Sequence, residues 1–119
     1  MRVQDLKVYQ KLCSLAIEVH FESLKFPQFE LYELGSQLRR SSNACPANVA
    51  EGFGNKHTKI YSECISRAQG EIRETVHHLY IAFKKSYISS ELYNSYNLRY
   101  EECSKMLFGL DKSLWTSEK

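Results

Sequence analysis

Glutamate and histidine stand at metal-ligand spacing at one place in the sequence. Glu74 precedes His77 by three residues, the Glu-x-x-His step that supplies ligands in di-iron helical bundles. Those centres need a second copy of the motif and further inward-facing glutamates, and this sequence has one copy. No Cys-x-x-Cys pair suggests zinc either. We therefore expect no metal and no cofactor, and we interpret these two residues, with Glu71 and His78, as exposed polar side chains paired along a helix.

Nucleophilic catalysis is the next possibility, because the chain has four cysteines: Cys13, Cys45, Cys64 and Cys103. Each lies on an apolar stripe, where a thiol acts as a small hydrophobe and its pKa rises. Their spacing matches no small disulfide scaffold. No Gly-x-Ser-x-Gly elbow is present, and Gly52-x-Gly54 is too short for a phosphate loop. We predict reduced, buried cysteines and a protein that is not an enzyme.

The segment from residue 37 to residue 52 is the most unusual one. If it is helical, at about 100° per residue one side carries a stripe of short side chains, namely Gln37, Ser41, Ala44, Asn48 and Glu51. Such a stripe suits close contact with a neighbouring helix or subunit. Three interpretations stay open, which are an internal polar clasp, a subunit interface and a ligand site. Arg40 flanks the stripe and could pair with Glu51 or with Glu74.

Basic residues are the last candidates for a binding function. They are spread over two helical segments, as Arg39, Arg40, Lys56, Lys59, Arg67, Arg73, Lys84 and Lys85. The chain also has eight tyrosines, and aromatic side chains beside arginine are what single-stranded RNA binding uses. Acidic residues are interleaved, however, and the net charge is only +2. A mixed, solvated surface is the alternative interpretation.

Helical periodicity dominates the elements that would position these residues. A first apolar stripe has steps of four, three and four residues, and Asp5 is a plausible N-cap before it; the helix should end before Phe26-Pro27. A second helix is predicted over about 30–51, with Pro46 kinking or restarting it and Gly52 and Gly54 in the stop that follows. The third is predicted over about 58–86 and the fourth over about 90–114, starting at Ser89 or Ser90.

Four helices with short connections pack best as an antiparallel up-down-up-down bundle, so we predict an all-α fold. At 119 residues the chain fits one domain over 1–119. Hydrophobic residues make up 43% and charged residues 25%, which is ordinary for a globular protein and excludes disorder. No apolar run of 18 residues suggests a membrane span, and a cytoplasmic location is the expectation.

Several motifs together resemble a known family. They are Asp5-Leu6-x-Val8-Tyr9-Gln10, Phe26-Pro27, Gln37-x-Arg39-Arg40, Asn48-Val49-Ala50-Glu51-Gly52-x-Gly54, and Ala68-x-Gly70 followed by Glu74. This pattern, over about residues 3–88, resembles small bacterial four-helix-bundle proteins, some of them encoded in intervening sequences of large-subunit ribosomal RNA genes. The chain departs from the family pattern at Tyr9, where tryptophan is usual, and at Asn55, where a basic residue is common.

The resemblance implies an up-down-up-down bundle, a ring-like homo-oligomer of five copies and no enzymatic activity. Our leading hypothesis is a homo-oligomer that binds RNA or a ribonucleoprotein, in which a ring presents Arg39, Arg40, Lys56 and Lys59 repeatedly. Gln37, Asn48, Glu51, Gly52, Gly54 and Glu74 are assigned to structure or to an interface. The alternative hypothesis is a protein-interaction scaffold with no role in nucleic-acid binding, in which the polar stripe and exposed apolar residues such as Phe53 and Trp115 make the contacts.

Overall fold

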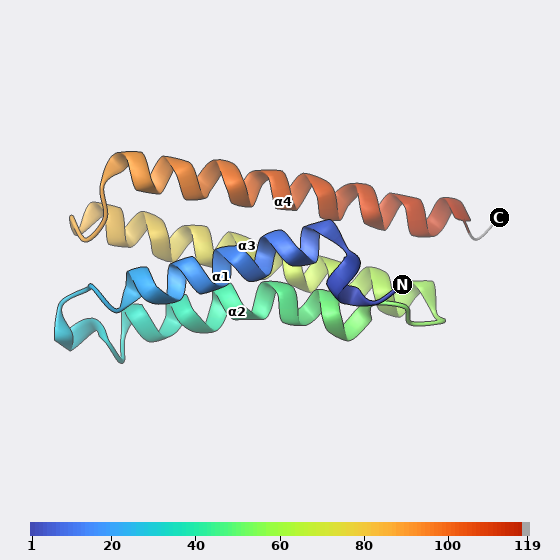
Figure 1. Ribbon diagram of the computed structural model, residues 1–119, viewed down its shortest axis with the longest axis horizontal. Coiled ribbons are helices and arrows are strands. Elements are labelled where there is room, and N and C mark those ends of the chain that lie inside the picture. The colour runs from blue at the N-terminus through green and yellow to red at the C-terminus, as the bar shows by residue number, and fades with distance from the viewer. Residues whose placement is uncertain (118–119) are drawn as a thin grey trace.

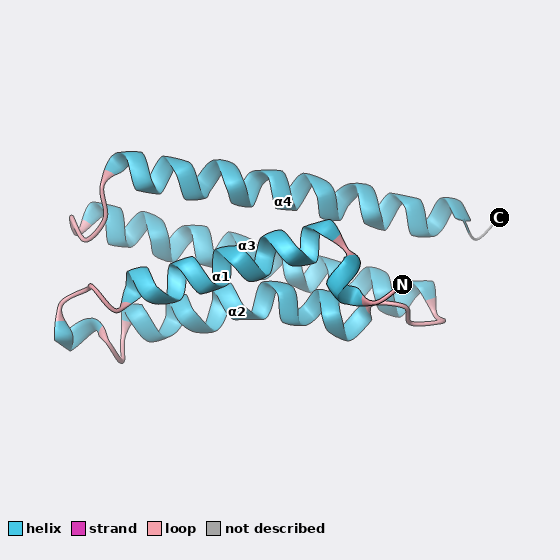
Figure 2. Cartoon of the chain, in the orientation of Figure 1, coloured by secondary structure: helices cyan, strands magenta, loops and turns pink. Residues whose placement is uncertain are grey.

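The computed structural model describes residues 1–117, and in this range it contains four long helices (Figure 1). These are α1 (Lys7–Ser23), α2 (Leu34–Gly52), α3 (Thr58–Lys84) and α4 (Ser90–Ser117), with short 3-10 turns at Val3–Asp5 and Gln28–Glu30. Successive helices run in opposite directions along a body 51 Å long and 24 by 20 Å across. The described residues contain no strand (Figure 2), so the predicted all-α four-helix bundle is confirmed.

The apolar stripes predicted from the sequence meet in one core. All four stripe residues of α1 are buried, and they are Val8, Leu12, Leu15 and Val19. Helix α2 contributes Leu38, Cys45 and Val49 to the same core, and α4 contributes Tyr96, Tyr100, Cys103 and Leu107. Among neighbouring helices, contact is most extensive between α2 and α3 and least extensive between α1 and α4. No helix in the described range has an apolar stretch long enough to cross a membrane.

Two predicted helix starts are wrong, and in both cases a carboxylate explains why. Asp5 does not cap α1. It ends the preceding 3-10 turn, and its side chain accepts a hydrogen bond from the Arg2 backbone N–H at 3.0 Å. Helix α2 begins at Leu34 and not at Glu30, because Glu30 belongs to the other 3-10 turn and its side chain is buried. The start of α4 agrees with expectation, since the Ser89 hydroxyl accepts the Leu92 N–H at 3.1 Å.

Pro46 lies inside α2 without interrupting it. Of the kink or restart predicted from the sequence, the restart is absent, because the helix continues from Leu34 to Gly52 through the proline. Proline has no N–H, so the carbonyl of Ser42 lacks its usual helical donor. Pro46 is itself buried, and the apolar surface that it buries offsets part of this lost hydrogen bond.

The Glu30 carboxylate connects the two loops at one end of the bundle. Its side chain is only 1% exposed. One oxygen, Oε2, accepts hydrogen bonds from Lys85 Nζ and from the Tyr87 hydroxyl, both at 2.8 Å. The Lys85 ammonium is the main cause of the lowered pKa of Glu30. The α1–α2 connection is thereby fixed to the α3–α4 connection through a charged, hydrogen-bonded contact.

Replacing Glu30 by glutamine should therefore make stability less dependent on pH. The ionised carboxylate is favoured in the folded state, so its contribution is present above the unfolded pKa of about 4.3 and is lost as the pH falls through the lowered folded pKa. We expect Glu30→Gln to lower Tm at pH 7, and the difference from wild type to shrink below about pH 4. Thermal unfolding followed by circular dichroism would measure both. Glu33→Gln, at an exposed neighbour, is the control; a Tm for Glu30→Gln equal to wild type at pH 7 would contradict the prediction.

Candidate functional site

The Arg40 guanidinium bridges α2 to two carboxylates of α3. It donates to both oxygens of Glu71 at 3.3 and 3.2 Å and also to Glu74. The hydrogen bond from Arg40 is the main cause of the lowered pKa of Glu74, and His78, at 3.2 Å from Glu74, lowers it further. Of the two partners predicted for Arg40, Glu74 is present and Glu51 is not. Two carboxylates surround one guanidinium, so this patch carries no excess positive charge.

Arg39 is also engaged within the chain. Its guanidinium donates to the Ser23 hydroxyl at 3.0 Å and to the Leu31 carbonyl at 2.6 Å, which ties α2 to the end of α1 and to the loop that follows. Gly35 makes room for this arrangement, since a Cβ there would lie 3.0 Å from Arg39 Nη1 and 2.9 Å from the Glu30 carbonyl oxygen. Arg39 therefore acts in this structure as a connector between elements.

The middle of the polar stripe is an internal clasp. Ser41 is fully buried, and its hydroxyl lies 2.9 Å from that of Thr75 on α3. Cys45 lies beside them, and burial raises the pKa of its thiol to about 12. Burial likewise raises the pKa of Cys103 to about 11. Thiols with such pKa values stay protonated near neutral pH and are poor nucleophiles.

Towards the C-terminal end of α2 the stripe becomes partly exposed. Asn48 donates to the Ala44 carbonyl at 2.9 Å and accepts from Arg67 at 3.4 Å, and Arg67 also donates to the thiol of Cys64 at 3.0 Å. The remaining two predicted members, Gln37 and Glu51, are exposed. The clasp thus covers the centre of the stripe, and the interpretations as an interface or a ligand site apply only to its ends.

Gly52 and Gly54 have different structural roles. A Cβ at Gly52 would lie 2.5 Å from the Cβ of Cys64, so only glycine allows α3 to approach α2 this closely. A Cβ at Gly54 would have no neighbour within 4 Å, but the φ of +72° at this residue is in the left-handed region that favours glycine. The first residue sets the helix contact, and the second permits the turn into α3.

Lys56 and Lys59 lie at the turn between α2 and α3, and both are exposed. Neither makes an ion pair with any residue in the described range. Arg40 meets α3 at Glu71 and Glu74, which are 12 and 15 residues beyond Lys59, or about 18–22 Å along the helix. The four basic residues predicted to act together therefore do not form one cluster within a single copy of the chain.

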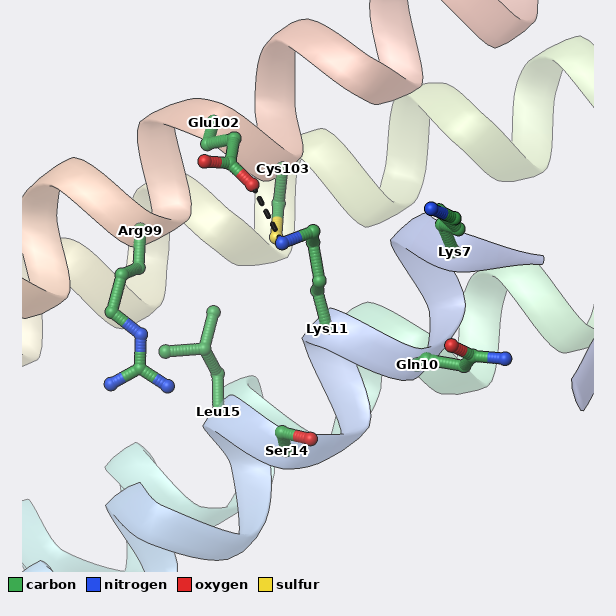
Figure 3. A pocket seen from close by; sticks show the side chains of 8 residues that line it. All are labelled: Lys7, Gln10, Lys11, Ser14, Leu15, Arg99, Glu102 and Cys103. Carbon is green, nitrogen blue, oxygen red and sulfur yellow. Dashed lines mark ion pairs between the residues drawn. The ribbon is translucent and has the colours of Figure 1, made fainter. Parts of the chain in front are cut away.

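A groove of about 430 Å³ lies between α1 and α4 (Figure 3). Its charged side chains are largely compensated: Lys11 and Glu102 form an ion pair at 2.9 Å, and Arg99 is paired with Glu18. Lys11 is the main cause of the lowered pKa of Glu102. The cysteine at its base is the buried Cys103. The two ion pairs join α1 to α4.

A family model described as "23S rRNA-intervening sequence protein" matches residues 4–109. The chain belongs to this family. The resemblance stated from the sequence motifs is thereby confirmed. No curated protein matches the chain significantly.

A solved structure shows the same fold. It is described as a protein with unknown function from the S23 ribosomal protein family of Bacteroides thetaiotaomicron, with 24% sequence identity and a TM-score of 0.76. The similarity covers 88% of this chain and 98% of that one. At this level of identity the comparison supports the architecture and carries no residue-level function.

The motifs that identify this 23S rRNA-intervening sequence protein mostly serve packing. Contacts among α1, α2 and α3 involve five of the motif residues, which are Arg39, Arg40, Asn48, Gly52 and Glu74. Of the Glu71–His78 cluster predicted to be exposed, only His77 is: Glu71 and Glu74 are partly buried, and His78 is buried beside Glu74. Within the described residues, no group of three histidine, cysteine or acidic side chains is placed to hold a metal ion.

An apolar outer surface on α1 and on Leu24, the residue that follows it, was missed by the sequence analysis. Ile17, Phe21 and Leu24 are 60%, 62% and 49% exposed, although the opposite side of the same helix is in the core. Their spacing of four and three residues is a helical stripe of its own. This spacing in the sequence was the signal by which the exposed surface could have been predicted, as a second apolar stripe on the same helix. Beside it, a groove of about 380 Å³ between α1 and α2 is lined by Cys13, Ala16, Ile17, Phe21, Asn43 and Pro46, with His20 and Arg39 adding polar groups.

Substituting Gly52 by alanine should destabilise the bundle. The new methyl group would overlap Cys64, so α2 and α3 would have to move apart, at a cost of about 1–3 kcal/mol. Gly109→Ala is the matched control, because Gly109 lies within α4 with nothing near its Cα and alanine favours a helix by up to about 1 kcal/mol. Urea unfolding would measure both changes. Equal effects of the two substitutions would contradict the close-contact role of Gly52.

Proposed function

We propose that this 23S rRNA-intervening sequence protein is a non-enzymatic assembly protein, whose copies associate through the outer faces of α1 and α2. The observation that carries the proposal is the exposed apolar stripe on α1, defined by Ile17, Phe21 and Leu24. A helix with apolar residues on two sides usually buries both of them. One side of α1 packs in the core of its own chain, and the other has no covering element in the described residues.

The adjacent surface of α2 suits a second helix. Ala47 and Ala50 are exposed there, so an incoming helix would meet short side chains along this part of α2. The groove between α1 and α2 offers an apolar recess beside them. These features favour an apolar helical partner over a small polar substrate.

A second copy of this chain is the partner that we propose. Helix α4 carries two further exposed apolar residues, Leu98 and Phe108, at 66% and 67% exposure. Contact between the α1–α2 surface of one copy and α4 of the next would be head-to-tail, and such contacts form a closed ring when the rotation between copies allows it. Five copies is the number that the family resemblance leads us to expect.

Charge substitutions on α1 test this proposal. We expect wild-type protein to elute as an oligomer, and the double variant Ile17→Glu, Phe21→Glu to elute as a monomer with unchanged helix content, because two buried carboxylates at an apolar contact are strongly unfavourable. Size-exclusion chromatography with light scattering measures the mass. A monomeric wild type would refute the proposal.

Two further single variants, one of them a control, refine the test. Tyr32→Glu alters a residue that is 85% exposed in the α1–α2 loop, and it should leave the oligomer intact. Phe108→Glu should dissociate the oligomer if α4 forms the other half of the contact. An intact oligomer of the α1 double variant would show that assembly uses a different surface.

RNA or a ribonucleoprotein is a second candidate partner, supported by Lys56 and Lys59, which are exposed and make no ion pair within residues 1–117. Trp115 of α4 is 45% exposed near them, and its indole N–H donates to Ser62, one turn after Lys59. Cations beside an exposed aromatic ring suit single-stranded RNA. Arg39 and Arg40 are occupied by partners in their own chain, so this candidate depends on the two lysines.

Removal of both lysines should weaken RNA binding mainly at low salt. Each lost phosphate contact reduces the slope of log Kobs against log salt by about 0.7 for a single strand, so Lys56→Ala, Lys59→Ala should lower it by about 1.4. Fluorescence anisotropy with a labelled oligouridine would measure the slope. Lys7→Ala, Lys25→Ala removes the same charge from α1 and the loop that follows it, and is the control. An unchanged slope for the first variant would exclude these lysines from phosphate binding.

A further inference from the structure

We propose that the outer face of α3 binds single-stranded RNA, with Tyr80 stacking on a base and with Arg73 and Lys84 contacting phosphates. The class of partner rests on the RNA candidate above, but the surface is a different one. Its α3 residues also lie on a different helix from the α1–α2 surface proposed for assembly.

Four exposed residues of α3 lie in one line along the outer side of the helix. Arg73, His77, Tyr80 and Lys84 follow one another at steps of four, three and four residues on α3. At about 100° per residue, the first and last differ by only about 20° around the helix axis. They extend over about 16 Å, the length of about five stacked nucleotides at about 3.4 Å each. All four are exposed.

The charge along this line has one sign. After Glu63, the exposed residues of α3 are Ser66, Arg67, Arg73, His77, Tyr80 and Lys84, and none is acidic. Within the described residues, neither Arg73 nor Lys84 makes an ion pair. The nearest acidic side chains of α3, Glu71 and Glu74, are held by Arg40 on the side that faces α2. The ion pairs of the α2–α3 contact thus leave positive charge on the outer face.

The Tyr80 ring packs against two other aromatic rings and is still accessible to solvent. Its ring centroid lies 5.9 Å from that of Tyr93 on α4 and 6.4 Å from that of Phe83, and these last two rings stack on each other at 5.3 Å. Its side chain is nevertheless 44% exposed. A ring fixed by its neighbours loses little side-chain entropy when a base stacks on it.

A shallow groove between α3 and α4 adjoins Arg73 and offers polar groups to a base edge. It measures about 320 Å³, and its lining includes Asn97 and Ser104 together with the apolar Ile72 and Val76. The acidic residue there, Glu101, is paired with Lys105 at 3.6 Å. Amide and hydroxyl groups can hydrogen-bond to unpaired bases, whereas the bases of a duplex are stacked and unavailable. The site therefore favours single strands over duplex RNA.

Anisotropy with a labelled 12-nucleotide oligouridine, at several salt concentrations, tests the proposal. We expect Tyr80→Ala to weaken binding about tenfold without changing the salt slope, and Tyr80→Phe to bind within about twofold of wild type, because stacking needs the ring and not the hydroxyl. Arg73→Ala, Lys84→Ala should reduce the slope by about 1.4. Lys7→Ala, Lys25→Ala should behave as wild type or nearly so, and circular dichroism would check that each variant is folded.

The other outcomes separate this site from the function on which it rests. If wild type binds no oligouridine at low salt, both the RNA candidate and this site are refuted. If wild type binds and only Lys56→Ala, Lys59→Ala weakens it, the RNA candidate stands and the α3 site is refuted. If polyglutamate displaces the oligonucleotide and Tyr80→Ala has no effect, the face is a site for acidic polypeptide and the proposal is overturned.

Discussion

Helices α2 and α3 can pack this closely only because short side chains line the surface between them. Gly52 accommodates Cys64, and Ser41 lies against Thr75 with their hydroxyls in contact. Once the two backbones are near each other, the longer Arg40 can reach the carboxylates of α3 from the edge of the contact. Helix α1 then packs along α2, and α4 along α3, so the positions of both outer helices depend on this central pair.

The same contact determines which charges are available on the surface. Guanidinium groups that a composition argument would count as free are occupied: Arg39 joins α2 to the α1–α2 loop, and Arg40 is shared by two glutamates. Those glutamates are thereby prevented from compensating the cations on the far side of α3. A chain with a net charge of +2 can consequently present positive charge on the outer face of α3, because Glu71 and Glu74 of that helix are paired with Arg40 on the side that faces α2.

Much of the fold could be predicted from the sequence, because the 3.6-residue repeat that makes a helix also places its buried residues, as the stripe from Val8 to Val19 shows. The pairing of Arg40 with Glu74 was one of two pairings left open for Arg40. The burial of Glu30 was not predicted. Glu30 meets Lys85 and Tyr87, which are 55 and 57 residues away, so nothing near it in sequence signals its burial. The second stripe of α1 was overlooked because the first already accounted for a helix.

The Glu30 contact also makes the two ends of the bundle unequal in local stability. At one end, any opening must separate a buried carboxylate from both an ammonium and a phenol, and this contact fixes two connections at once. At the other end, the α2–α3 turn carries a left-handed glycine and exposed residues. We therefore expect amide hydrogens near the α2–α3 turn to have a lower free energy of opening than those beside Glu30, and fraying to start at the end that carries Lys56 and Lys59.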